Sequence, residues 1–328
     1  MKIWKAITLF GIIFFLTSCG GKKDITVIKL AHGLDVKHSV HKAMVFMGKD
    51  LEKRSGGKMK VDIYPSSQLG SERECLELLQ IGSLGMTKVS AGVLENFAPK
   101  MKIFGLPFLF RDKQHVFSVL DGPIGKMLLD DGTKYWLKGM GYYDAGSRSF
   151  YTKEKPIQTP EDLKGLKIRV MESVSAMEMV RSLGGSPTPI SWGELYTSLQ
   201  QGVVDGAENN PPSFYFSAHY EVCKHYSLDE HSVLPDVLVI GTHLWDRLSP
   251  QEQQWLSESV KVSIDYQRKL WAESEKDCLQ KVQEAGVKIY HPDKSLFAAK
   301  VGKMYDKYKD DKEMYQLIED IRTFGKLK

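Results

Sequence analysis

Strand-like and helix-like segments alternate along this chain, and this alternation is the feature that most constrains its fold. Residues 25–31 are β-branched and alternate in polarity, residues 40–53 carry apolar side chains at helical spacing, and residues 59–64 alternate strictly. A Ser-x-x-Glu capping sequence at 71–74 predicts the start of another helix, which extends to about Gln80. Strands and helices joined by short connections favour an α/β fold with a parallel or mixed sheet.

The second half of the chain follows the same pattern without repeating the sequence. A helix start at 159–162 precedes a predicted strand at 166–171. A second capping sequence at 191–194 predicts a helix that ends at Gly202, and residues 203–206 predict a short strand that leads into a turn.

The longest helical segment extends from about Ser249 to Ala285. At a rise of 1.5 Å per residue it would be roughly 50 Å long, so we expect it to kink or to cross between two lobes. Two lobes also agree with the length of 328 residues, because a typical single domain has about 100–200 residues. Residues 295–324 predict further helices on the outside of the protein.

Composition excludes few classes of protein but argues against one partner. Hydrophobic residues make up 42% of the chain and charged residues 26%, as in an ordinary globular protein. The net charge of +4 is spread along the sequence, and lysine-rich stretches such as residues 305–312 alternate in sign. Such stretches are typical of a solvated helix face, so we expect no nucleic-acid partner.

The N-terminal residues 1–18 have the pattern of a secretory signal peptide, with two lysines before an apolar segment at 6–15. This segment is too short to span a bilayer, which needs roughly 20 apolar residues. Residues 16–19, Leu-Thr-Ser-Cys, resemble the bacterial lipobox, which implies cleavage before Cys19 and a lipid on that cysteine. Residues 19–24 would then tether a membrane-anchored lipoprotein in the periplasm, or otherwise outside the cytoplasm. A membrane-anchor helix or a chance cysteine is the alternative.

Three further cysteines stand at wide spacing, and an odd number of this kind is not a disulfide framework. Their apolar, helix-like surroundings predict buried thiols, although the sequence leaves one disulfide bond open. The three residues are Cys75, Cys223 and Cys278.

Motifs of several enzyme classes are missing from the sequence. There is no Gly-x-Ser-x-Gly elbow, no His-Glu-x-x-His and no complete dinucleotide-binding fingerprint, and residues 122–126 lack the spacing of a phosphate-binding loop. His32, His38 and His41 cluster in a predicted strand-to-helix loop, which favours a polar surface over a metal site. We therefore expect neither a cofactor nor a metal.

Arg169 is a candidate ligand-binding residue because it lies within an apolar predicted strand, near its carboxyl end. In open α/β sheets this end faces the crevice that binds ligands. A guanidinium group can hold a carboxylate through two parallel hydrogen bonds. A structural ion pair is the alternative for this residue.

Two further candidates follow from local context. Arg148 lies where the chain would cross between lobes, although a surface arginine is the alternative. Asn209 follows a predicted tight turn and precedes two prolines, which would hold its amide in one orientation. Ordinary turn chemistry is the alternative for Asn209.

Four segments, in this order over nearly the whole chain, together resemble one family. They are residues 64–70, 163–170, 194–209 and 286–289. The chain is similar in them to the solute-binding proteins of TRAP transporters, the C4-dicarboxylate-binding type. This resemblance implies an α/β fold in the form of a two-lobed clamp like that of periplasmic binding proteins, with mixed sheets and a long kinked helix that spans the lobes.

The resemblance also implies how the chain is divided between the lobes. Residues 25–146 and about 236–275 would form lobe I, and residues 147–235 and about 276–328 would form lobe II.

Ligand contacts are implied as well. In the family an arginine holds the substrate carboxylate, and this role falls on Arg169. A second arginine falls on Arg148, the binding asparagine on Asn209, and an aromatic residue that packs against the sugar acid on Trp192.

Looser similarity adds four residues to the implied site. Glu72, His32 and Ser90 would face the pocket from lobe I, and His231 would lie near the binding asparagine. A sialic-acid binder would carry a carboxylate in place of Ser90, so this ligand is disfavoured.

Residues 210–215 and 226–231 resemble the branch that binds hexuronates. The implied function is therefore extracytoplasmic capture of a carboxylate-bearing sugar acid, with glucuronate or galacturonate favoured. A monomer would deliver it to the small and large membrane subunits of a TRAP transporter. The ligand could instead be a C4-dicarboxylate, sialic acid or another organic acid. The sequence is also compatible with a secreted sugar-acid enzyme that uses His32, Glu72 or His231 as acid and base, and with a receptor-like sensor.

Overall fold

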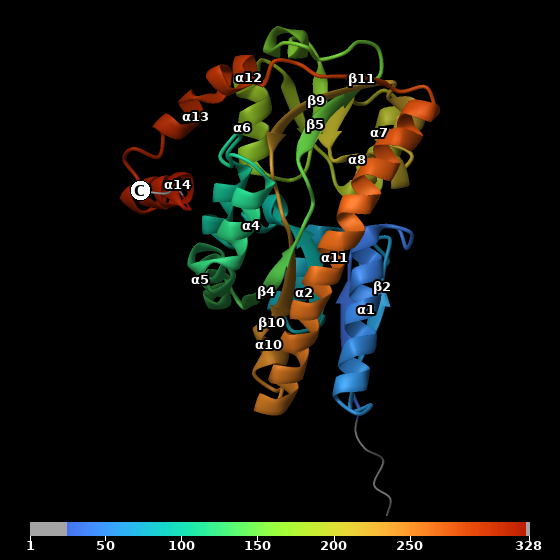
Figure 1. Ribbon diagram of the computed structural model, residues 1–328, viewed down its shortest axis with the longest axis vertical. Helices are drawn as coiled ribbons and strands as arrows, with labels where there is room; N and C mark the ends of the chain where they lie inside the picture. Colours follow the sequence, from blue (N-terminus) through green and yellow to red (C-terminus); the bar gives the residue numbers. More distant parts are fainter. Residues whose placement is uncertain (1–24, 326–328) are drawn as a thin grey trace, which may run out of the picture.

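A computed structural model describes residues 25–325 of the chain (Figure 1). The predicted signal peptide, the lipidation site Cys19 and the tether at 19–24 lie outside the described residues. Two β-sheets, each covered by helices, form the two lobes of the molecule. The predicted α/β class and the mixed sheets are confirmed.

Lobe I is built on a five-stranded sheet in the order β2-β1-β3-β10-β4. β1 pairs in parallel with β2 and β3, and β10 pairs antiparallel with β3 and β4. The strands are β1 (Thr26–Ala31), β2 (Met59–Tyr64), β3 (Met86–Ser90), β4 (Leu137–Tyr143) and β10 (Asp236–Gly241).

Lobe II is built on a six-stranded sheet in the order β11-β9-β5-β8-β6-β7. β5 pairs antiparallel with β8 and β9, whereas β6 pairs in parallel with β7 and β8. The strands are β5 (Arg148–Thr152), β6 (Lys167–Val170), β7 (Ser186–Pro189), β8 (Gly206–Asn209), β9 (His225–Ser232) and β11 (Lys288–Tyr290).

Helices cover both sheets, and most are short. They are α1 (Ser39–Arg54), α2 (Glu72–Gln80), α3 (Ala91–Leu94), η1 (Pro99–Gly105), α4 (Lys113–Asp121), α5 (Pro123–Asp131), η2 (Gly132–Tyr135), η3 (Pro160–Leu163), α6 (Val174–Leu183), η4 (Trp192–Glu194), α7 (Leu195–Gln200), α8 (Pro211–Phe216), α9 (His219–Val222), α10 (Thr242–Trp245), α11 (Pro250–Glu284), α12 (Lys294–Val301), α13 (Lys303–Asp306) and α14 (Lys312–Thr323).

The predicted long helix is α11, which is continuous over 35 residues and spans both lobes (Figure 1). It begins with a capping box in which Ser249 and Glu252 satisfy each other's backbone amides. Leu256 of α11 is buried in the core of lobe I, and Val282 is buried in the core of lobe II. The helix thus joins the two lobes along one side of the molecule.

A crossing segment between β4 and β5 is held against the middle of α11. The buried Gln267 side chain accepts a hydrogen bond from the Asp144 amide at 2.8 Å and donates one to the Asp144 carbonyl at 2.7 Å. Gly146 then turns the chain with a positive φ of 58°. A Cβ atom there would lie 2.6 Å from Oε1 of Glu275, so only glycine fits without displacing that side chain.

The C-terminal helices do not all pack on one lobe. Phe297 of α12 is buried in the core of lobe II beside α6. Leu317 and Ile321 of α14, however, are buried in the core of lobe I, beside Phe104 of η1. The predicted range of lobe II, which included residues 276–328, therefore contains a helix that packs on lobe I.

The strand predicted at 203–206 is wrong, because β8 begins only at Gly206. Gly206 lies so close to β5 that a Cβ would be 2.3 Å from the carbonyl oxygen of Tyr151. Glycine is required there for close packing of two strands, and not for a turn. As a result Asn209 lies at the end of a strand rather than after a turn.

Other local predictions have mixed outcomes. The capping boxes at Ser71 and Ser249 are confirmed. The helix predicted from 191 to 202 is divided into η4 and α7, and Ser191 makes no side-chain hydrogen bond to a helix amide. The three cysteines of the described chain are buried and free, and are Cys75, Cys223 and Cys278.

A buried charge network joins β5, β8 and β9 inside lobe II. Arg148 on β5 pairs with Glu208 on β8, with Nε 2.5 Å from Oε2. His231 on β9 lies behind Glu208, with Nε2 3.4 Å from Oε2, and its Nδ1 is 2.8 Å from Oδ2 of Asp229. All four side chains are buried, so each charge depends on its neighbours for compensation.

The network shifts two pKa values in opposite directions. Burial alone would lower the pKa of His231, but the attraction of Asp229 and Glu208 outweighs burial and raises it from 6.5 to about 9. Burial alone would raise the pKa of Glu208, but Arg148 and His231 lower it from 4.5 to about 2. Both groups are therefore charged at neutral pH.

We predict that the free energy of unfolding falls between pH 6.5 and pH 9. The pKa of His231 is higher in the folded chain, so its contribution is complete below about pH 6.5 and is lost as the pH rises through about 9. The expected loss is on the order of 2–3 kcal/mol, measurable by urea unfolding at several pH values. Buried histidines with lowered pKa values, such as His32 and His219, act below this window.

A matched pair of variants isolates this residue. His231→Gln should remove most of the pH slope while lowering stability throughout, whereas His243→Gln, at an exposed position of α10, should keep the slope. Equal unfolding free energies of the unmodified protein at pH 6.5 and pH 9 would contradict the assignment.

Candidate functional site

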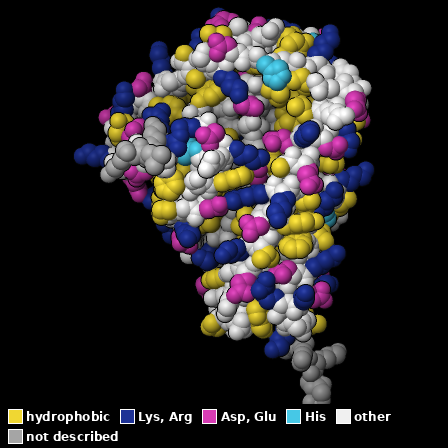
Figure 2. Space-filling view, viewed as in Figure 1, with side chains coloured by type: hydrophobic (Ala, Val, Ile, Leu, Met, Phe, Trp, Pro, Cys, Tyr) yellow, Lys and Arg dark blue, Asp and Glu magenta, His cyan; other side chains and the backbone are white. Residues whose placement is uncertain are grey.

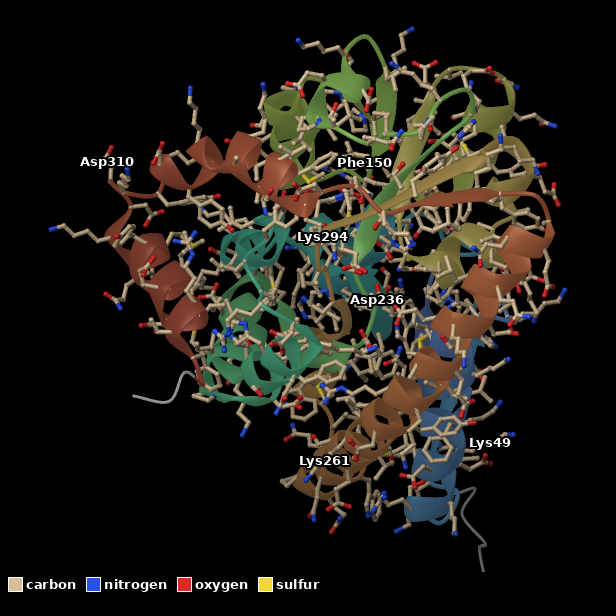
Figure 3. The ribbon with its side chains drawn as sticks, turned by 45° about the horizontal axis from the view of Figure 1, so that its top comes forward. Lys49, Phe150, Asp236, Lys261, Lys294 and Asp310 are labelled. Atoms are coloured by element: carbon tan, nitrogen blue, oxygen red, sulfur yellow. The ribbon has the colours of Figure 1, made fainter. Side chains whose placement is uncertain are left out.

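A cavity between the two lobes brings together side chains from both sheets and from the crossing segment. Its lining residues from lobe I and α11 are Gly33, Leu34, His38, Ser71, Glu72, Lys88, Ser90, Val93, Asp236 and Trp271. Those from lobe II and the connections are Ala145, Arg148, Arg169, Met171, Glu172, Ile190, Ser191, Trp192, Asn209, Asn210, Ser213 and Leu234. Asp236 is labelled near the centre of the molecule in Figure 3, away from Lys49 and Lys261.

Arg169 on β6 is buried in this cavity without a counter-ion. Its side chain is 2% exposed, Nε donates to the Ile190 carbonyl at 2.8 Å, and Nη1 has no partner among residues 25–325. No salt bridge to Arg169 forms within that range, which argues against the structural ion pair. Burial lowers the pKa of Arg169, as expected for a cation that lacks an anionic partner.

An aromatic ring lies beside this guanidinium. The centroid of the Trp192 ring is 5.8 Å from Cζ of Arg169, within the range of a cation–π contact. The ring also packs edge-on against His219 at 5.2 Å. Trp192 therefore lies on the cavity wall in a defined orientation.

Arg148 differs from Arg169 because its charge is compensated inside the protein. Besides the Nε contact, its Nη2 donates to Oε1 of Glu208 at 2.9 Å and to the Glu208 carbonyl at 2.8 Å. Its Nη1 donates to Oδ1 of Asn209 at 2.8 Å. Burial opposes the charge of Arg148, but Glu208 more than offsets it and raises the pKa.

Asn209 has its amide oriented by two hydrogen bonds to one atom. Oδ1 accepts from Arg148 and from the backbone amide of Asn210 at 2.9 Å. The NH₂ group of the same amide is thus left free to donate hydrogen bonds into the cavity. Tyr226 fixes the backbone at the same position by donating to the Asn209 carbonyl at 2.7 Å.

The part of the cavity wall that lobe I supplies is acidic. Lys88 on β3 is buried, and its Nζ lies 2.9 Å from Oε1 of Glu72 and 3.2 Å from Oδ1 of Asp236. The second oxygen of Glu72 accepts from the Ser90 amide at 3.1 Å. Burial raises the pKa of Asp236, partly offset by Lys88. Two carboxylates around one ammonium group leave this wall rich in hydrogen-bond acceptors.

The structure brings together six of the eight predicted site residues. Arg169, Arg148, Asn209, Trp192, Glu72 and Ser90 all line the cavity. His32 and His231 are buried but are not among the lining residues.

Each of these two histidines lies behind the wall. Nδ1 of His32 accepts from the Leu34 amide at 3.1 Å, and its Nε2 lies 3.0 Å from Nδ1 of His41. Burial, reinforced by Lys88, lowers the pKa of His32 to about 2. His231 pairs with Glu208, which in turn pairs with the cavity residue Arg148.

Sequence reasoning missed several cavity residues with polar groups, among them Lys88, His38 and Asp236. Lys88 was detectable by the signal that identified Arg169, a charged residue within an apolar strand. His38 and Asp236 carried no such signal, because their positions on the wall depend on how α1 and β10 pack. Among the described residues, no three His, Cys, Asp or Glu side chains lie together in a way that could hold a metal ion.

Comparison with known proteins identifies the family of this chain. The model of the family "Bacterial extracellular solute-binding protein, family 7" matches residues 30–311. A 2,3-diketo-L-gulonate-binding periplasmic protein of Escherichia coli is 34% identical, over 73% of both chains.

Two solved structures of this kind carry bound sugar acids. The TRAP periplasmic solute-binding protein of Xanthobacter autotrophicus, with β-D-galacturonate, is 40% identical and has a TM-score of 0.88 over 90% of this chain and 99% of that one. That of Anaerococcus prevotii, with D-glucuronate, is 34% identical with a TM-score of 0.89, over 91% and 97% of the two chains. This chain therefore belongs to the family 7 of bacterial extracellular solute-binding proteins.

Proposed function

We propose that the protein is the extracytoplasmic solute-binding subunit of a TRAP transporter and that it captures a hexuronate, glucuronate or galacturonate. The observation that carries this proposal is the buried, uncompensated guanidinium of Arg169 on the wall of the cavity. The galacturonate and glucuronate bound to the two solved relatives support the choice of ligand.

A single carboxylate satisfies the charges of this cavity. Arg169 offers one uncompensated cation, because Arg148 is paired with Glu208. A ligand held by Arg169 would extend toward Glu72 and Asp236, whose oxygens accept hydrogen bonds from hydroxyl groups. A second carboxylate at that end would be repelled. The cavity therefore favours a sugar acid over a C4-dicarboxylate.

The remaining cavity residues have complementary roles in this proposal. The NH₂ group of Asn209 would donate to a ligand oxygen, and the face of Trp192 would pack against the carbon face of the sugar. Arg148 and Ser90 would contribute polar contacts from the two lobes. His32 and His231 would act as positioning residues from behind the wall.

An enzymatic function has less support. A sugar-acid enzyme would use His32, Glu72 or His231 as acid and base, yet neither histidine lines the cavity. The family is one of solute-binding proteins. Such an enzyme would convert a uronate during long incubation, whereas a binding protein would release it unchanged.

Delivery to the small and large membrane subunits, lipid attachment at Cys19 and a monomeric state complete the proposal. None of the described helices has the length and hydropathy needed to cross a bilayer. Lysines, arginines and acidic side chains are interspersed on the face shown in Figure 2.

A receptor-like sensor would use the same closed form, and genes for two membrane subunits beside this one would favour transport.

A further contact joins the two lobes and would stabilise the closed form. Glu95, which follows α3 in lobe I, accepts hydrogen bonds from the Ser175 amide at 2.9 Å and the Ser175 hydroxyl at 2.7 Å. It also accepts one from the Ser173 hydroxyl at 2.9 Å. Both serines begin α6 in lobe II, so the carboxylate also lies favourably at a helix N-terminus.

Replacing Glu95 with alanine should weaken ligand binding by about tenfold, because three charge-assisted hydrogen bonds between the lobes are lost and the closed form becomes less favourable. Titration calorimetry with the identified uronate measures the change in affinity. Glu77→Ala, which removes a half-exposed ion pair with Arg73 on α2, is the matched control and should bind normally. Equal affinity of the Glu95 and Glu77 variants would contradict the role of this contact.

A ligand panel tests the proposed function directly. Thermal unfolding of refolded, ligand-stripped protein should show a rise in midpoint of several degrees with glucuronate or galacturonate, since saturation at 1,000 times the dissociation constant adds about 4 kcal/mol. Succinate, malate and sialic acid should give much smaller shifts. A large shift with succinate or malate alone would replace the hexuronate assignment, and no shift with any acid would remove the basis of the proposal.

Arg169→Lys should lower the affinity for the uronate at least tenfold, because lysine keeps the charge but cannot form two parallel hydrogen bonds to a carboxylate. Calorimetric titration measures the loss. Arg181→Lys, at an exposed position of α6, provides the control and should bind as the unmodified protein does. Unchanged affinity of the Arg169 variant would rule out the carboxylate role.

A further inference from the structure

His38 is a second buried hydrogen-bonding group without a partner on the cavity wall. The residue lies at the N-cap of α1 and is 2% exposed. Its Nε2 is shielded from solvent and has no hydrogen-bond partner in the described part of the chain. None of the roles assigned to the other cavity residues uses this nitrogen.

The other ring nitrogen determines where the proton is. Nδ1 of His38 accepts a hydrogen bond from the Val40 amide at 3.2 Å, so it carries no proton. Burial, reinforced by Lys88 and Lys42, lowers the pKa of His38 to about 3, and the ring is neutral at physiological pH. A neutral ring with an unprotonated Nδ1 has its proton on Nε2, which is therefore a donor.

The ring is held between the lobes. Its centroid lies 5.7 Å from that of Phe216, at the end of α8 in lobe II, and 5.9 Å from that of Trp271 on α11. The contact with Phe216 is edge-on, and the helix cap fixes the opposite side of the ring. Contacts within the protein thus orient the imidazole, which lowers the entropic cost of binding.

We propose that His38 is a specificity-determining residue, whose Nε2–H group donates a hydrogen bond to one non-carboxylate oxygen of the sugar acid that Arg169 holds. The inference rests on the proposed function and adds to it a requirement for an oxygen at a particular place on the sugar. A buried donor left unpaired by a ligand without that oxygen carries an energetic penalty. Such a site rejects the analogue more strongly than an apolar site would.

The acidic wall alone cannot recognise an oxygen of the sugar as a hydrogen-bond acceptor. Glu72 and Asp236 accept hydrogen bonds from hydroxyl groups, but a hydroxyl group donates only one. His38 supplies a donor from lobe I, and Arg169 supplies donors from lobe II. A ligand must therefore present both acceptors and donors to lobe I, which a polyhydroxylated acid does and a simple dicarboxylate does not.

The experiment compares His38→Asn with the unmodified protein by titration calorimetry. Asparagine is among the best N-cap residues, so the start of α1 is preserved, but its shorter side chain ends before the position of Nε2. Glucuronate, galacturonate and their 2-, 3- and 4-deoxy analogues are the probes. His243→Asn, on the surface of α10, is the control for a histidine replacement.

We expect the unmodified protein to lose at least tenfold in affinity for the deoxy analogue that lacks the contacted oxygen. His38→Asn should lose about tenfold for the parent uronate and little more for that analogue. His38→Gln, whose longer amide can place an N–H group near the same position, should recover part of the affinity. Thermal midpoints of the variants confirm that each remains folded.

Two failures are distinguishable. If the unmodified protein binds neither uronate, the proposed function is wrong and this inference with it. If it binds a uronate but His38→Asn binds within twofold of it, or shows the same losses across the deoxy series, only the role of His38 is overturned.

Discussion

A guanidinium buried without its own counter-ion is the interaction on which the rest of this structure depends. The charge of a buried arginine is ordinarily compensated by a carboxylate of the same protein, as Glu208 compensates Arg148 without a ligand. Arg169, on β6 of the same sheet, lacks such a partner within residues 25–325. A closed, dry cleft around an isolated cation is costly, so closure and capture of an anion favour each other.

Much of the fold and of the site could be predicted from local patterns, and the failures have specific physical causes. Capping boxes at Ser71 and Ser249 depend on residues three apart and were recognisable in the sequence. The start of β8 was not, because Gly206 is needed for close approach to Tyr151, a contact between segments distant in sequence. Local sequence patterns predict the conformation of the nearby backbone. They carry little information about which distant strand will pack against a given residue.

The same limit explains the histidines. His32 and His38 lie in one short connection, and the resemblance implied a ligand contact for the former, whereas the structure places the latter on the cavity wall. The helix cap and the rings of Phe216 and Trp271 hold His38 in this position. By contrast, Arg169 was identifiable from sequence because a charge inside an apolar strand is unusual in any context.

The two hydrogen bonds between Gln267 and the backbone of Asp144 have a mechanical consequence. They fasten the end of β4 to the middle of α11, so this connection cannot stretch when the cleft opens. In the proposed function, opening of the cleft would then be a rotation of the lobes about this fastened point and not a separation along the long axis of the molecule. Closure would return Arg169 to the same position relative to the acidic wall of lobe I.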